Sequence, residues 1–93
     1  MKLLIVDDDI YTREGLAETI PWNLYGIDDV MQAENGKEAL HTVSWYLPDL
    51  IITDIRMPGC TGLELVEQLR EIYRSVSFII ISGYTNFEYT RLA

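Results

Sequence analysis

The chain has 93 residues, of which 48% are hydrophobic, so it is long enough for one compact domain and too short for two. Its 15 acidic and 7 basic side chains give a net charge of -8, which argues against direct binding of nucleic acid or of an anionic membrane by this segment. A single cysteine excludes an internal disulfide, and with no recognisable signal peptide and no apolar run near the roughly 20 residues of a membrane span, a cytoplasmic location is expected.

Four short apolar runs are the predicted strands, and in chain order they are residues 3–6, 30–33, 50–53 and 78–81. Each run ends at small or polar residues and shows no alternation with polar residues. Continuous apolar runs of this length are typical of strands that are buried on both faces of a parallel sheet. Each predicted strand therefore needs helices packed against both of its faces.

Four segments with helical spacing are the predicted helices. The first spans residues 10–20 and ends at Pro21, because a helix interior does not tolerate proline. The second spans residues 36–46 and the third opens at Thr61, and each begins with a capping box, in which a polar residue precedes a glutamate by three positions. A fourth is predicted from residue 85 onward by the same spacing. The alternation predicts a doubly wound α/β domain with a parallel sheet, right-handed crossovers and helices on both faces.

Acidic and hydroxyl side chains follow the predicted strands at their carboxyl ends. Asp7, Asp8 and Asp9 follow the first strand, Asp54 follows the third and Ser82 follows the fourth. Ligands of doubly wound sheets bind at this edge. Carboxylates that gather there repel one another unless a cation neutralises them, and Mg²⁺ prefers carboxylate and phosphate oxygens. The sequence therefore predicts a site for Mg²⁺ and a phosphate, at which Asp54 could attack phosphorus.

The stretches LLIVDDD, LIITDIRMPG and FIIISGY, in this order and spacing, resemble the receiver domain of two-component response regulators, and the resemblance covers all 93 residues. It implies a flavodoxin-like fold with strand order 2-1-3-4. It also implies a signalling domain that takes a phosphoryl group from a histidine kinase and switches an output domain, so that the chain is no enzyme beyond its own phosphotransfer. The SGYTNFEY and IPWNLYG segments are most similar to receivers joined to helix-turn-helix transcription regulators of the arabinose-regulator type.

The same resemblance implies roles for individual residues. Asp54 would be the phosphoacceptor. Ser82 would be the switch hydroxyl that moves to the phosphoryl group, and Gly83 would leave the pocket open. The ligands of Mg²⁺ would be three carboxylates and one backbone carbonyl, those of Asp7, Asp8, Asp54 and Arg56.

The chain departs from receivers of this kind at its carboxyl end. Such receivers resemble one another in a fifth strand that ends in a Lys-Pro pair and in a fifth helix, and residues 1–93 are expected to form a receiver domain without them. We expect weak phosphorylation, because the lysine is one of three stabilising partners of the phosphoryl oxygens. We also expect self-association, because residues 78–81 would form an open edge of the sheet.

Two other functions stay open for this sequence. Asp7 and Asp9 after an apolar strand resemble the nucleophile and acid of a haloacid-dehalogenase-type phosphohydrolase, although Tyr11 stands where that motif has Thr or Val. The other function is that of a protein-interaction module with the receiver fold but without phosphorylation, which would bind no Mg²⁺. Asp9 by itself is better interpreted as a helix cap or a surface residue than as a metal ligand.

Overall fold

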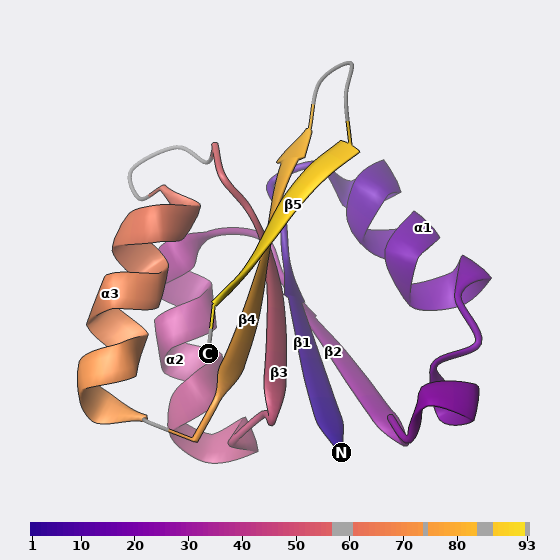
Figure 1. Ribbon diagram of the computed structural model, residues 1–93, viewed down its shortest axis with the longest axis horizontal. Helices are drawn as coiled ribbons and strands as arrows, with labels where there is room; N and C mark the ends of the chain where they lie inside the picture. Colours follow the sequence, from indigo (N-terminus) through magenta and orange to yellow (C-terminus); the bar gives the residue numbers. More distant parts are fainter. Residues whose placement is uncertain (57–60, 74, 84–86, 93) are drawn as a thin grey trace.

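A computed structural model describes the backbone of residues 1–56, 61–73, 75–83 and 87–92, with side chains as far as Ile81. Within these residues the strands are β1 (Lys2–Val6), β2 (Asp29–Ala33), β3 (Leu50–Asp54), β4 (Ser77–Gly83) and β5 (Phe87–Leu92). The helices are α1 (Ile10–Thr19), α2 (Gly36–Tyr46), α3 (Gly62–Ile72) and a short 3-10 helix, η1 (Trp22–Tyr25). The strands form one sheet in the order β2-β1-β3-β4-β5, with helices on both faces (Figure 1).

The four parallel strands have the predicted order, and their carboxyl ends meet at one edge of the sheet. Val6 is in register with Ala33 of β2 and with Thr53 of β3. Asp54 is in register with Ile81 of β4. The doubly wound, flavodoxin-like fold is therefore confirmed, and the residues that follow β1 and β3 come to lie side by side.

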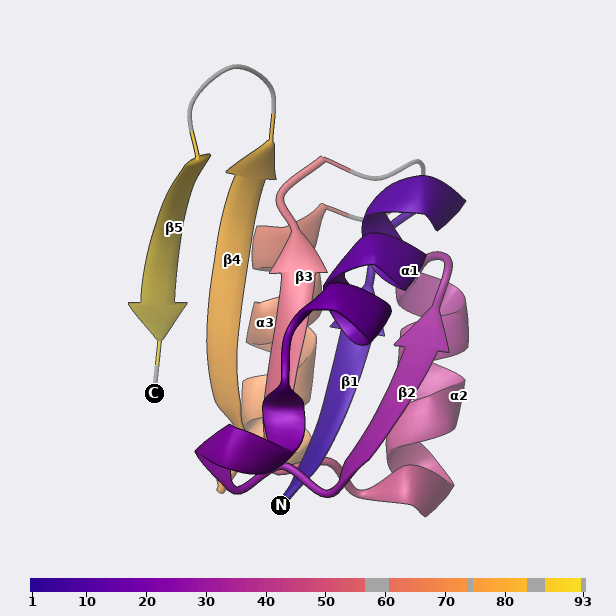
Figure 2. The same ribbon diagram turned by 90° about the vertical axis from the view of Figure 1, so that its right-hand side faces the viewer.

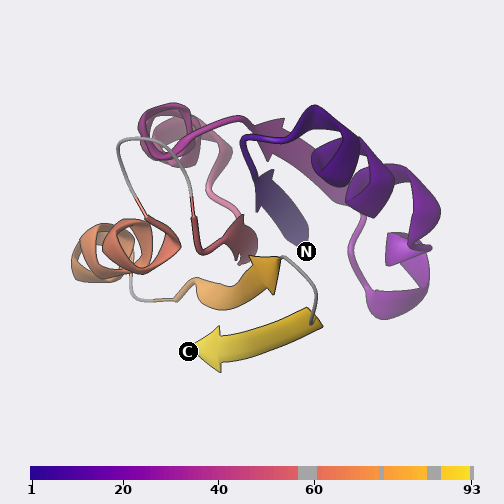
Figure 3. The ribbon, with the colours of Figure 1, turned by 90° about the horizontal axis from the view of Figure 1, so that it is seen from above.

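Two layers of apolar side chains pack on opposite faces of the sheet. Helices α2 and α3 cover one face and α1 covers the other, as Figure 3 shows from above. Along β1, Leu4 and Val6 pack toward α2 and α3, and both are at most 1% exposed. Leu3 and Ile5 pack toward α1 and are fully buried. Burial of both faces accounts for the continuous apolar run of β1. None of the described helices is both long and apolar enough to cross a lipid bilayer.

The helix predicted from residue 85 onward is wrong, because Phe87–Leu92 form β5, which runs antiparallel to β4 (Figure 2). Residues 84–86 lie outside the described part of the chain. Pairing with β4 gives the backbone N–H and C=O groups of both strands partners, and Phe, Tyr and Thr favour strands.

This pairing also corrects the prediction that β4 forms an open edge of the sheet. The side of β4 that faces away from β3 pairs with β5 at six register positions, from Phe78 with Leu92 to Gly83 with Phe87. The backbone groups that would recruit a second chain are thus already paired within this chain. The predicted self-association through β4 loses its structural basis.

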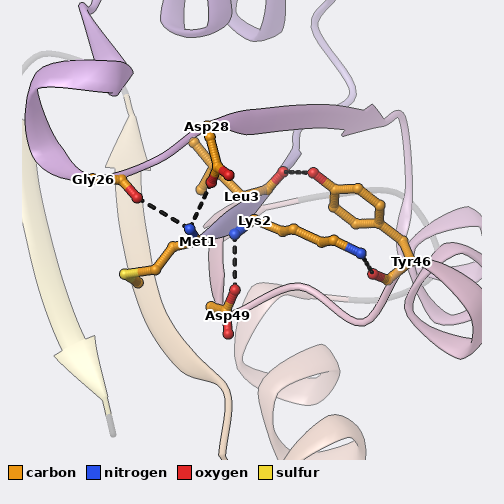
Figure 4. A network of polar contacts seen from close by, with 7 residues as sticks. All are labelled: Met1, Lys2, Leu3, Gly26, Asp28, Tyr46 and Asp49. Atoms are coloured by element: carbon orange, nitrogen blue, oxygen red, sulfur yellow. Dashed lines mark hydrogen bonds and ion pairs between the residues drawn. The ribbon is translucent and has the colours of Figure 1, made fainter.

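Polar contacts hold the amino-terminal edge of the sheet, as Figure 4 shows from close by. The backbone N–H of Lys2 donates to Asp49 Oδ2 at 2.8 Å, and the Lys2 ammonium group donates to the Tyr46 carbonyl oxygen at 3.2 Å. The Tyr46 hydroxyl donates to the Leu3 carbonyl oxygen, also at 3.2 Å. These contacts tie β1 to the end of α2 and to the residue before β3, and so set the relative positions of the two strands that precede the acidic residues.

Candidate functional site

Three carboxylates meet at the carboxyl edge of the sheet, where β1 and β3 end side by side. Asp7 and Asp8 follow β1, and Asp54 is the last residue of β3. Each offers one carboxylate oxygen, and these oxygens lie within 4.8 Å of one another. Asp7 is buried, Asp54 is half-buried and Asp8 is exposed, so solvent reaches the cluster at Asp8. The structure brings together the three carboxylates that the sequence singles out as metal ligands.

Burial and mutual repulsion disfavour the charged state of this cluster. Burial is the main cause that raises the pKa of Asp7 to about 6, and the charges of Asp54 and Asp8 add to it. A hydrogen bond from the Asp9 N–H, 2.9 Å from Asp7 Oδ1, opposes the shift. Burial likewise raises the pKa of Asp54, with Asp8 adding to the effect and two backbone N–H groups opposing it. A nearby cation would relieve this repulsion.

The donor set fits a hard divalent cation. All three side chains present oxygen atoms, which Mg²⁺ prefers. Oxygens bound to one Mg²⁺ lie about 2.1 Å from the ion and so at most about 4.2 Å from each other. The observed limit of 4.8 Å therefore requires only small side-chain movements. Asp7, Asp8 and Asp54 are the residues that could hold the ion, and water, backbone or phosphate oxygens would complete its coordination.

Asp9 has a different role from its two neighbours. Its Oδ1 accepts the N–H of Tyr11 at 3.0 Å, and its Oδ2 accepts the Thr12 hydroxyl at 3.0 Å. The interpretation of Asp9 as the cap of α1 is confirmed. Because α1 engages both carboxylate oxygens, this geometry argues against a haloacid-dehalogenase-type site, in which Asp9 would act as an acid together with Asp7.

The remaining predicted residues lie at the same edge, and their roles stay predictions. Ser82 and Gly83 are the last residues of β4, beside the end of β3. The structure describes the backbone of these two residues and not their side chains. Arg56 lies two residues beyond β3 and is exposed. Residues 57–60, which include Pro58 and Gly59, lie outside the described residues.

Gly62 also belongs to this site, although it is not among the residues predicted from the sequence. It is the first residue of α3, and its N–H donates to the Ile55 carbonyl oxygen at 3.0 Å. A methyl group at its Cα would overlap the carbonyl oxygen of Asp54 and lie 3.1 Å from the Cα of Ile55. The available signal is a glycine directly after the capping Thr61, since glycine is unfavourable in helices unless close packing requires it.

The family model of the response regulator receiver domain matches residues 3–93 of the chain. The transcriptional regulatory protein YesN of Bacillus subtilis is 38% identical over 92 residues, which cover 99% of this chain and 25% of YesN. The transcriptional regulatory protein HptR of Staphylococcus aureus is 40% identical over 90 residues, which cover 97% of this chain and 35% of HptR. The chain thus spans a quarter to about a third of the length of these relatives.

Solved structures show the same likeness. The chain is 38% identical to a two component transcriptional regulator AraC from Clostridium phytofermentans, with a TM-score of 0.85, and the match covers 91% of this chain and 68% of that one. It is also 38% identical to the REC domain of AraT, a response regulator from Geobacillus stearothermophilus, with a TM-score of 0.82 and coverage of 89% and 64%. Both solved structures therefore resemble the chain in sequence as well as in fold.

Proposed function

Because the chain belongs to the response regulator receiver family, we propose that Asp54 accepts a phosphoryl group from a histidine kinase and that Mg²⁺ assists the transfer. Receiver domains are signalling domains rather than enzymes in the ordinary sense, and they bind Mg²⁺ at an acidic pocket. The single observation that carries the proposal is the meeting of Asp7, Asp8 and Asp54, with carboxylate oxygens within 4.8 Å of one another.

Asp54 supplies the nucleophile. A bond forms between one of its carboxylate oxygens and phosphorus while the bond from phosphorus to the donor histidine nitrogen breaks, and the leaving imidazole takes a proton from water. The backbone N–H groups of Arg56 and Ile55 favour the ionised, nucleophilic form of Asp54. Bound Mg²⁺ compensates the charge of the carboxylates and phosphoryl oxygens. The residues that would hold it are Asp7, Asp8, Asp54 and, through its carbonyl, Arg56.

Ser82 and Gly83 act after the transfer. The Ser82 hydroxyl donates a hydrogen bond to the new phosphoryl group, and Gly83 leaves room for that group. Their position at the end of β4, the strand next to the one that ends in Asp54, supports this assignment. The movement of Ser82 toward the phosphoryl group alters the end of β4, and this conformational change is transmitted to an output domain. YesN, HptR and the AraC regulator are transcriptional regulators, which supports an output domain that regulates transcription. The resemblance of the sequence to receivers of the arabinose-regulator type further favours a helix-turn-helix output domain.

We place residues 1–93 in one receiver domain, since the family model matches residues 3–93. The net charge of -8 supports the proposal that this segment does not bind nucleic acid directly. We further propose a cytoplasmic location.

Incubation with acetyl phosphate, with and without Mg²⁺, followed by intact mass spectrometry tests the proposal. With Mg²⁺, one phosphoryl group should be added to the chain. Asp54→Asn should accept none. Asp29→Asn is the matched control, because it makes the same substitution at an exposed residue at the amino end of β2, and it should behave as the unsubstituted chain.

Three results would contradict the proposal in different ways. Equal phosphorylation of Asp54→Asn would refute the assignment of Asp54. Absence of both phosphorylation and Mg²⁺ binding would favour an interaction module with the receiver fold. Steady turnover of an aryl phosphate would favour a haloacid-dehalogenase-type phosphohydrolase.

A further inference from the structure

Arg13 of α1 reaches back to the chain segment that carries the acidic residues. Its Nη1 donates to the carbonyl oxygen of Asp7 at 2.8 Å, and its Nε donates to the Gln32 side-chain oxygen at 3.2 Å. Its backbone N–H donates to the Asp9 carbonyl oxygen at 3.0 Å, as a first hydrogen bond of α1. One half-buried side chain thus connects α1, the end of β1 and the end of β2.

The guanidinium group of Arg13 uses neutral acceptors although three carboxylates stand at the same edge of the sheet. Both of its side-chain acceptors are uncharged, one a backbone carbonyl and the other an amide oxygen. A cation that paired with Asp7, Asp8 or Asp54 would compete with a metal ion for the same oxygens. Because the guanidinium group of Arg13 instead donates to a backbone carbonyl and an amide oxygen, it does not compete for the carboxylate oxygens that a metal ion would use.

The Asp7 carbonyl that accepts from Arg13 belongs to the peptide that joins Asp7 to Asp8. The orientation of this peptide plane decides where the Cβ of Asp8 points, because the chain has only two soft torsions per residue. Two further bonds hold its neighbourhood: the Asp7 N–H donates to the Ala33 carbonyl oxygen at 3.1 Å, and the Asp9 N–H donates to Asp7 Oδ1 at 2.9 Å. The carbonyl bond from Arg13 completes the support of this turn from the side of α1.

We propose that Arg13, held by Gln32, is a positioning residue that turns the Asp7–Asp8 peptide so that both carboxylates face Asp54 and can share one divalent cation. The inference rests on the proposed metal binding and adds to it a residue that does not touch the ion. Partners that orient metal ligands in this way typically contribute about 10-fold or more to metal affinity.

The direction of the effect separates positioning from simple electrostatics. Arg13→Ala removes a positive charge near the site, which by electrostatics alone would tighten the binding of a cation. Loss of positioning instead weakens it, and we expect the dissociation constant for Mg²⁺ to rise about 10-fold. Arg13→Lys keeps the charge but has no planar fork for two acceptors, so it should give an intermediate weakening. Gln32→Ala should give a smaller weakening, because the bond to the Asp7 carbonyl stays.

Titration of the ¹⁵N-labelled chain with Mg²⁺ alone, followed by amide chemical shifts, measures the affinity and shows that each variant is folded. Arg70→Ala is the matched control, since it removes the same charge from an exposed position in the last turn of α3. Urea unfolding in EDTA measures the stability of each variant without the metal ion. If the role of Arg13 were merely structural, the loss of stability in Arg13→Lys and Gln32→Ala would parallel their loss of Mg²⁺ affinity. We expect no such parallel.

The Mg²⁺ titrations test the role of Arg13 separately from the proposed metal site. If the unsubstituted chain does not bind Mg²⁺, the proposed metal site fails and the role of Arg13 fails with it. If the unsubstituted chain binds and Arg13→Ala binds equally well or more tightly, positioning by Arg13 is refuted while the metal site stands. If Arg13→Ala does not fold, Arg13→Lys and Gln32→Ala decide the question, and unchanged affinity in both would overturn the inference.

Discussion

At the scale of single residues, Gly62 shows how closely α3 is seated on the strand that carries Asp54. The atoms that a methyl group would meet there belong to the backbone, which cannot turn aside as a side chain can. We expect Gly62→Ala to lower the free energy of unfolding by about 2 kcal/mol, as overpacking does in protein cores. The same strain should displace Asp54 and slow phosphorylation. Urea unfolding and the acetyl phosphate assay measure the two effects.

Gly15→Ala provides the matched control for this substitution. Gly15 lies inside α1, and a methyl group there would meet no heavy atom within 4 Å. Alanine is favoured over glycine in a helix by roughly 0.5–1 kcal/mol, so this variant should be slightly more stable and should phosphorylate normally. Equal effects of the two substitutions would show that α3 does not press on Asp54.

The carboxylates of the site could be predicted from the sequence, whereas the contacts of Arg13 and Gly62 could not. Residues that follow parallel strands converge at one edge of a sheet, so Asp7, Asp8 and Asp54 are brought together by topology alone. The contact of Arg13 depends on how α1 packs over the sheet, and an arginine on a short helix has no local signal that distinguishes it from a solvated side chain. The contact of Gly62 depends in the same way on the seating of α3.

At the scale of elements, the starts of α2 and α3 confirm the predicted caps to different extents. The capping box of α3 is complete: Thr61 Oγ1 accepts the Glu64 N–H at 3.1 Å, and Glu64 Oε1 accepts the Thr61 N–H at 3.1 Å. In α2, Asn35 Oδ1 accepts the Glu38 N–H at 2.8 Å. Both caps were predictable because each requires residues only three positions apart.

These two caps allow a paired test of which helix supports the site. Thr61→Ala and Asn35→Ala should each lower the free energy of unfolding by about 1 kcal/mol, the usual effect of losing a cap. Only Thr61→Ala should also weaken Mg²⁺ binding and slow phosphorylation, because the next residue, Gly62, lies so near the backbone of Asp54 that a methyl group would not fit between them. Urea unfolding and the Mg²⁺ titration separate the effects. Equal loss of metal affinity in both variants would mean that the site responds to stability in general.

The error at the carboxyl end also belongs to the scale of elements. The spacing that predicts a helix from residue 85 onward is a local signal. Such a signal decides the secondary structure only where no neighbouring strand offers more favourable backbone hydrogen bonds. The outer side of β4 offers a row of backbone partners, which Phe87–Leu92 occupy as β5. Whether a segment meets such an edge is a tertiary property, which capping spacing alone does not reveal.

For the whole molecule, the acidic site opposes the stability that the apolar core provides. Asp7 is 8% exposed, and folding raises its pKa from 3.8 to about 6, mainly through burial. A carboxyl group of this kind binds its proton more tightly in the folded chain. Its contribution to stability is therefore fully present below pH 3.8 and is lost as the pH rises through about 6. The metal-free chain should lose on the order of 2 kcal/mol in this way.

Asp7→Asn removes the charge while its side-chain oxygen can still accept the Asp9 N–H. In EDTA, above the Asp7 pKa of about 6, we expect the variant to have the higher free energy of unfolding and a weaker dependence on pH. Mg²⁺ should act in the opposite sense. At about ten times its dissociation constant it stabilises the unsubstituted chain by about 1.4 kcal/mol, and Asp7→Asn should lose most of this gain.

Urea unfolding of both chains, in EDTA and in Mg²⁺, on either side of the Asp7 pKa measures these differences. Asp29→Asn should change neither the pH dependence nor the response to Mg²⁺, because its side chain is exposed at the other end of the sheet. If Asp7→Asn is less stable than the unsubstituted chain in EDTA above this pKa, its neighbours stabilise the charge of Asp7 without a metal ion. The carboxylate cluster would then have a structural role. If Asp7→Asn is instead more stable, Asp7 is a buried charge that lowers stability and is kept for binding a cation.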